Sequence, residues 1–223
     1  EPAVVDAVVR CAGRERQQEG EHAPVVLRRL LTTAQQCGIR GLDTYHRLLA
    51  NDAQLAAGDL PAAEALLDEG DTIAFAVPYW TTYQDIADIV NAKTLHLDCP
   101  ASQNYKITPA QLDAALQQKP KVFLFNNPNN PTGMVYSKEE IAALAEVLVN
   151  YPDTWIIADD IYHRMVFDGL GYHNFIQFQP ELRERVIFVD SLSKTYGMPG
   201  WRLGFMVGPE SVAKALVTLN SNH

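Results

Sequence analysis

The chain carries the run Val186-Ile187-Phe188-Val189-Asp190-Ser191-Leu192-Ser193-Lys194-Thr195-Tyr196-Gly197-Met198-Pro199-Gly200-Trp201-Arg202. Its first four residues are bulky and apolar, which is typical of a strand that helices cover on both faces. Lys194 follows this strand among hydroxyl groups, two glycines and an arginine. The pattern indicates an amine that attacks a carbonyl, as an aldehyde cofactor carrying a phosphate would require. For Ser-Lys-Thr taken alone, a solvated surface loop remains the alternative.

A second informative stretch is Asn126-Asn127-Pro128-Asn129-Asn130-Pro131-Thr132-Gly133, which follows the apolar run Val122-Phe123-Leu124-Phe125. Asn, Pro and Gly fix turns, and Asn side chains offer both hydrogen-bond donors and acceptors. Two Asn-Pro steps at the carboxyl end of a strand fit a loop that aims side chains at a ligand. An ordinary loop between a strand and a helix would have a similar composition.

Two further strand ends carry side chains suited to an aromatic cofactor. Trp155-Ile156-Ile157-Ala158-Asp159-Asp160-Ile161-Tyr162 ends an apolar run in two carboxylates. A buried carboxylate needs a positive partner or donors, and a protonated pyridine nitrogen would serve, although either Asp alone could cap a helix. Pro78-Tyr79-Trp80 follows the apolar run 72–77. Trp80 could stack on a planar ring, or it could be a core or rim aromatic.

Taken together in chain order, the four stretches resemble the fold-type-I aminotransferases that use pyridoxal phosphate, and among them the aspartate aminotransferase branch. The likeness runs from about Leu66 to Asn220. It implies an enzyme, a transferase of amino-acid metabolism, in which Lys194 forms the Schiff base with pyridoxal 5'-phosphate and then moves the substrate's α-proton. It also implies that Asp159 keeps the pyridine nitrogen protonated.

The resemblance assigns the remaining site residues as well. Asn130 and Tyr162 match the pair that hydrogen-bonds the cofactor's 3-hydroxyl oxygen, with Tyr162 counted among the catalytic residues. Trp80 matches the aromatic that stacks on the ring. The phosphate ligands implied are Ser191, Ser193 and Arg202.

The implied reaction moves the amino group of an amino acid, aspartate or one of a broad range, to a 2-oxo acid by ping-pong kinetics. Two alternatives stay open. Pyridoxal-phosphate lyases and synthases of the same fold share the lysine, aspartate and asparagine. A truncated or frame-shifted remnant would at most bind the cofactor.

The spacing of apolar runs predicts an α/β fold. Strands are expected at 72–77, 93–97, 121–126, 155–159, 186–190 and 203–207, and helices near 81–90, 109–118, 137–149 and 210–219. Ser137 with Glu140, and Thr108 before Pro109, are typical helix starts. Such alternation predicts a three-layer sandwich around a mostly parallel sheet, as in the large domain of the resembled enzymes. Ligands then bind at the carboxyl ends of the strands.

Composition narrows the class of protein further. The chain has 223 residues, 47% of them hydrophobic and 20% charged, and its net charge of −9 argues against nucleic acid or an anionic membrane as a partner. Cys11, Cys37 and Cys99 are too few and too scattered for a disulfide framework or a metal site. Without an apolar run of about 18 residues or a signal peptide, we expect a cytoplasmic protein. The family resemblance implies a homodimer.

Residues 1–70 form an N-terminal segment largely unmatched to the family, whereas 71–223 are expected to form a partial cofactor-binding large domain. All seven lysines lie after residue 92, while seven of the eleven arginines lie within the first 47 residues. This bias prompts the hypothesis that about 11–63 come from a shifted reading frame; a divergent segment with an amphipathic helix at 25–31 is the alternative. The resemblance further implies that the family's small C-terminal domain is absent.

Overall fold

A seven-stranded sheet organises the residues that the computed structural model describes, which are 45–51, 59–201 and 203–221. The strands run in the order β1-β7-β6-β5-β4-β2-β3. Five neighbours, β3, β2, β4, β5 and β6, are parallel, whereas β7 is antiparallel to both β6 and β1. The bounds are β1 Tyr45–Asn51, β2 Thr72–Val77, β3 Lys93–Asp98, β4 Val122–Asn126, β5 Trp155–Asp159, β6 Val186–Ser191 and β7 Leu203–Pro209.

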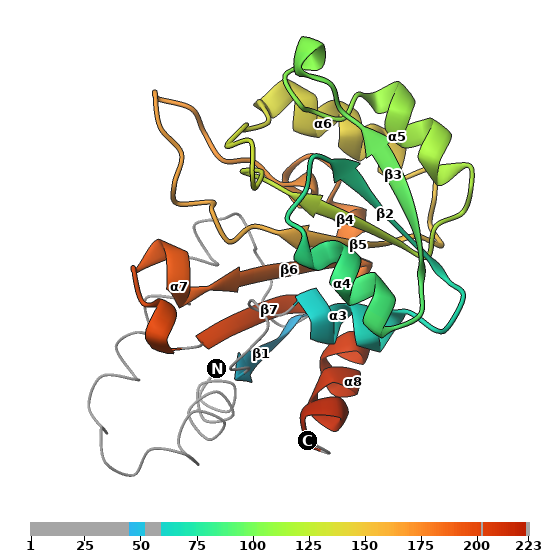
Figure 1. The fold of residues 1–223 in the computed structure, drawn as a ribbon, viewed down its shortest axis with the longest axis vertical. Coiled ribbons are helices and arrows are strands. Elements are labelled where there is room, and N and C mark those ends of the chain that lie inside the picture. Colours follow the sequence, from blue (N-terminus) through green and yellow to red (C-terminus); the bar gives the residue numbers. More distant parts are fainter. Residues whose placement is uncertain (1–44, 52–58, 202, 222–223) are drawn as a thin grey trace.

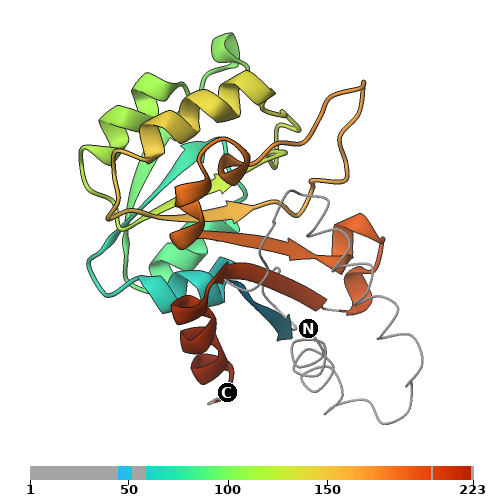
Figure 2. The same ribbon diagram turned by 180° about the vertical axis from the view of Figure 1, so that it is seen from behind.

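Helices cover both faces of this sheet, as Figures 1 and 2 show from opposite sides. One face carries α5 (Pro109–Leu116) and α6 (Lys138–Leu148), and the other carries α3 (Asp59–Leu66), α4 (Thr82–Ile89) and α8 (Glu210–Ser221). A single short helix, α7 (Leu192–Thr195), follows β6 directly. Short 3-10 turns are η2 Ala101–Gln103, η3 Phe175–Gln177, η4 Pro180–Glu184 and η5 Pro199–Trp201. The three-layer α/β sandwich predicted from the sequence is therefore confirmed.

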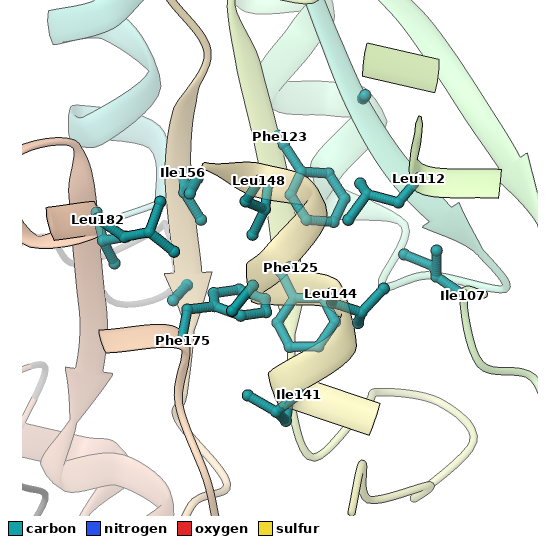
Figure 3. Close-up of a cluster of buried hydrophobic side chains, with 14 of the residues drawn as sticks. Ile107, Leu112, Phe123, Phe125, Ile141, Leu144, Leu148, Ile156, Phe175 and Leu182 are labelled. Carbon is teal, nitrogen blue, oxygen red and sulfur yellow. The ribbon is translucent and has the colours of Figure 1, made fainter. Parts of the chain in front are cut away.

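Strand β4 shows why the central strands are continuous apolar runs. Phe123 and Phe125 point into the cluster beneath α5 and α6, while Val122 and Leu124 point into the cluster beneath α3, α4 and α8. Because successive side chains alternate between faces, a sheet covered on both faces needs apolar residues at every position. Figure 3 shows the first cluster, in which α6 supplies Leu144. Each such side chain contributes roughly 1.5–3 kcal/mol when fully buried.

All six strands and all four helices expected from the sequence are present, with ends that shift by at most two residues. The two helix starts also form as predicted. Ser137 Oγ accepts from Glu140 N at 3.2 Å while Glu140 Oε2 accepts from Ser137 N at 2.7 Å, which satisfies two backbone donors at the start of α6. Thr108 and Gln111 cap α5 in the same way.

Besides the short 3-10 turns, the described residues include β1, α3 and α7, which were not expected from the sequence. Strand β1 pairs with the edge of β7, and α3 packs against α8 and α4, so part of the N-terminal 70 residues belongs to the same sandwich. Such long-range pairing leaves little local signal in the sequence. The residues of the reading-frame hypothesis at 11–44 and 52–58 lie outside the described residues.

Candidate functional site

The carboxyl ends of β2, β4, β5 and β6 lie at one edge of the sheet, because these strands are parallel neighbours. Each end leads into one of the stretches singled out in the sequence. The edge therefore brings together the segments of Trp80, Asn130, Asp159 and Lys194, with α7 standing at the end of β6 (Figure 1). Open α/β sheets bind ligands at such an edge.

Asp159, the last residue of β5, is a buried carboxylate at this edge, with 4% of its surface exposed. Its Oδ2 accepts a hydrogen bond from the hydroxyl of Tyr83, and its Oδ1 accepts from Ile161 N at 3.3 Å. Burial raises the pKa of this carboxyl to about 6, and the two hydrogen bonds oppose that rise. An anion held in this way is ready for a cationic partner.

Lys194 lies exposed in the single turn of α7, so its amine is accessible from solvent. Lys194 Nζ stands 5.7 Å from the centre of the Tyr162 ring, within the range of a cation–π contact. Ser191 caps this turn, since its Oγ accepts from Ser193 N at 3.2 Å. Four predicted site residues thus lie near one another at this end of β6: Ser191, Ser193, Lys194 and, from the loop after β5, Tyr162.

The asparagine loop is tied to β5 through one side chain. Asn126 Nδ2 donates to the backbone oxygen of Asp159 at 2.8 Å, while Asn126 Oδ1 accepts from Asn130 N at 2.6 Å. Asn126 therefore fixes where Asn130 stands relative to the carboxylate strand. Trp80 is half-buried and meets the ring of Tyr83 edge-on, with 5.7 Å between centroids.

Of the predicted site residues, Arg202 lies outside the described residues. The roles of the others in binding a cofactor stay predictions. One small cavity of about 10 Å³ opens nearby between β2 and β4, lined partly by Tyr83 and Asn126. That volume suits about one water molecule, so this cavity is not itself a place for a cofactor.

Sequence reasoning missed a layer of polar residues behind Asp159. Asp190 Oδ2 lies 3.4 Å from Nδ1 of His163, and Asp160 accepts a hydrogen bond from the hydroxyl of Tyr172. Burial raises the pKa of both Asp160 and Asp190 well above the usual range and lowers that of His163. Burial thus disfavours the charged form of each residue, and His163 Nδ1 also lies 3.0 Å from the backbone oxygen of Asp160.

A sequence signal for part of this layer exists. Asp190 directly follows the apolar run of β6, just as Asp159 closes that of β5. In the part of the chain that the structure describes, no group of three or more His, Cys, Asp or Glu side chains is arranged to hold a metal ion. None of the helices in that part is long and apolar enough to cross a membrane.

Comparison with known proteins gives a consistent picture. A family profile described as "Aminotransferase class I and II" matches residues 56–222. The chain is 38% identical over 160 residues to an aspartate/prephenate aminotransferase of Cereibacter sphaeroides, which covers 72% of this chain and 40% of that protein. An aspartate aminotransferase of Rhizobium meliloti is likewise 38% identical over 160 residues, covering 72% of this chain and 39% of the relative.

Solved structures of aspartate aminotransferases are similar to this chain as well. The crystal structure of the aspartate aminotransferase from Rhizobium meliloti superimposes with a TM-score of 0.82 at 31% identity, over 99% of this chain and 55% of that one. An aspartate aminotransferase from Rhodobacter sphaeroides gives 0.76 at 25% identity, over 97% of this chain and 56% of the other. The chain spans about two fifths of the length of the curated relatives it matches.

Proposed function

The chain belongs to the class I and II aminotransferases, and from this premise we propose that it transfers an amino group from an amino acid to a 2-oxo acid with the help of pyridoxal phosphate. The observation that supports the proposal is that an accessible lysine amine and a buried, hydrogen-bonded carboxylate lie at or just after the carboxyl ends of two neighbouring parallel strands, β6 and β5. Lys194 supplies the amine and Asp159 the carboxylate. A buried carboxylate is costly unless a partner compensates it, which supports a ligand-binding role for Asp159.

The residues present fit that cofactor in their chemistry. An amine must reach an aldehyde, and Lys194 is exposed. A carboxylate must meet a protonated ring nitrogen, and Asp159 is buried with a donor on each oxygen. A buried hydroxyl, Thr195 Oγ1, finds no hydrogen-bond partner within the described residues, beside Lys194. Ser191 and Ser193 add hydroxyls at the same turn for a phosphate.

When bound, pyridoxal phosphate supplies an aldehyde that takes up an amino group and a ring that accepts the electron pair left by the departing α-proton. Lys194 Nζ would hold the cofactor covalently and, once free, accept the substrate's α-proton as a general base. Asp159 would hold the proton on the ring nitrogen through its Oδ atoms. Asn130 and Tyr162 would orient the ring by hydrogen bonds, and Trp80 would cover one of its faces.

The amino donor that we propose is aspartate. The relatives quoted above are named as aspartate or aspartate/prephenate aminotransferases, and the chain shares 38% of its matched residues with them. We propose further that the protein is cytoplasmic and assembles as a homodimer, as the family resemblance implies. Sedimentation of the purified chain tests the assembly, and a single monomeric species would contradict it.

The test of the function uses the purified chain and pyridoxal phosphate. We expect a visible absorption band on adding the cofactor, and its loss in Lys194→Ala. Lys214→Ala is the matched control, since Lys214 is an exposed lysine on α8 paired with Glu210 at 2.7 Å. Adding aspartate should shift the band, and a 2-oxo acid should restore it.

Each other outcome has a distinct meaning. No band in the unsubstituted chain would contradict cofactor binding and support the remnant alternative. A band that survives Lys194→Ala would refute the assignment of the lysine. Release of ammonia or a cleaved side chain in place of a 2-oxo acid would point to a lyase.

A further inference from the structure

Tyr83 is a buried side chain that sequence reasoning did not place in the site. It lies in the first turn of α4 with 1% of its surface exposed, and its hydroxyl donates to Asp159 Oδ2. Ile161 N donates to the other oxygen at 3.3 Å. Two donors, one on each oxygen, fix the plane of the carboxylate rather than only its position.

The Tyr83 ring also contacts Trp80, which follows β2 by three residues. Tyr83 stands three residues after Trp80, and Tyr83 N donates to the backbone oxygen of Trp80 at 2.9 Å. The rings of Trp80 and Tyr83 meet edge-on with centroids 5.7 Å apart. The ring of Phe75 packs against that of Tyr83 with centroids 6.0 Å apart. One side chain thus contacts both the carboxylate and the half-buried tryptophan.

We propose that Tyr83 is a positioning residue that fixes Asp159 relative to Trp80, so that the cofactor meets a carboxylate and an aromatic face in one set arrangement. This inference rests on the proposed function for the identity of the ligand. The contacts themselves do not depend on it.

A tyrosine suits this place because it combines a buried ring with a neutral donor. Hydrogen bonds to a charged group are stronger than those between neutral groups. Loss of the Tyr83 hydroxyl should therefore raise the proton affinity of the Asp159 carboxylate strongly. Among the described residues, Asp160 and Asp190 are the carboxyl groups whose pKa responds to the charge of Asp159. The charge of Asp159 adds to the burial that raises the pKa of Asp160 and of Asp190, while Arg164 lowers the pKa of Asp190 and His163 lies beside Asp190. The hydrogen bonds from Tyr83 and from Ile161 N favour the ionised form of Asp159.

The first experiment needs no cofactor. The carboxyl groups of the chain are labelled with ¹³C-aspartate and titrated by NMR, with Asp159→Asn identifying the signal. We expect Tyr83→Phe to raise the proton affinity of Asp159 about tenfold or more, because a charge-assisted bond is lost. Tyr151→Phe is the matched control. It removes a tyrosine–aspartate hydrogen bond of 2.6 Å to Asp113 of α5, which covers the other face of the sheet.

The second experiment measures the dissociation constant of pyridoxal phosphate in a double-mutant cycle. Tyr83→Phe should weaken binding about tenfold in the unsubstituted chain and less than twofold beside Asp159→Asn. An equal loss in both backgrounds, or an unchanged Asp159 titration, would overturn the inference and leave Tyr83 a packing residue.

A further variant keeps the inference testable if the loss of the hydroxyl unfolds the chain. Site-specific 3-fluorotyrosine at position 83 keeps the ring and makes the hydroxyl a stronger donor, so the proton affinity of Asp159 should fall. An unchanged or increased affinity would contradict the inference. If the unsubstituted chain binds no cofactor, the proposed function fails, whereas the carboxyl titration still decides the role of Tyr83.

Discussion

The most informative single substitution in this chain is Asp159→Asn, studied in the absence of cofactor. Burial raises the pKa of Asp159 to about 6 from the ordinary 3.8. The folded state therefore holds a proton that the unfolded state has already lost across this interval. Stability should fall as the pH rises from about 4 to about 6, and stay reduced above it.

The size of the effect follows from the same two values. At 1.36 kcal/mol per pKa unit, the ionised Asp159 destabilises the fold by about 3 kcal/mol at pH 7 and above. Asn is neutral and of the same shape, but it keeps only one of the two accepted hydrogen bonds, a loss of about 1 kcal/mol. The substituted chain should therefore be more stable by about 2 kcal/mol at pH 7.5 and slightly less stable near pH 4.

Urea unfolding of both chains between pH 4 and pH 8 measures this difference directly. Comparing the two chains largely cancels the titration of residues outside the carboxylate cluster. A stability difference that stays the same across this range would refute the reasoning, because it would show that Asp159 does not change its protonation on folding. So would an Asn variant that is the less stable one at pH 7.5.

Three further substitutions probe the fold around the site by thermal or urea unfolding. Ser137→Ala removes the cap of α6 and should cost about 1 kcal/mol, whereas a change under 0.3 kcal/mol would show that the capping contacts do not contribute. Leu144→Ala opens a void in the fully buried cluster under α6 and should cost roughly 2–5 kcal/mol, with a smaller loss meaning that the cluster can collapse around it. Phe167→Ser changes a side chain that is 73% exposed and should alter stability by less than about 0.5 kcal/mol, so a large loss would reveal a partner for this ring.

Ionisation of the buried carboxyl groups at this edge opposes folding, because burial raises the pKa of each. Asp159, Asp160 and Asp190 lie together where β5 and β6 end, and each is penalised by burial. Proteins commonly keep such unfavourable groups where a ligand needs them. The difference in unfolding free energy between Asp159→Asn and the unsubstituted chain would measure how much stability this carboxylate costs.

Most of the sheet could be predicted because its signal is local. Apolar runs such as 122–125 and 186–189 indicate strands buried on both faces. The helix starts at Ser137 and Thr108 can be recognised from four consecutive residues each. The ends of these strands then indicate where Lys194 and Asp159 lie, because parallel strands share one carboxyl edge. Fold class, the edge that bears the site and the family resemblance all follow from sequence patterns.

The tertiary structure alone decided the contacts between segments far apart in the chain. Tyr83 and Asp159 are separated by 76 positions, and no local pattern connects them. The same holds for the pairing of β1 with β7 and for His163 beside Asp190. Periodicity records which face of an element is buried, whereas hydrogen-bond partners and pKa values depend on which side chains meet after the elements pack.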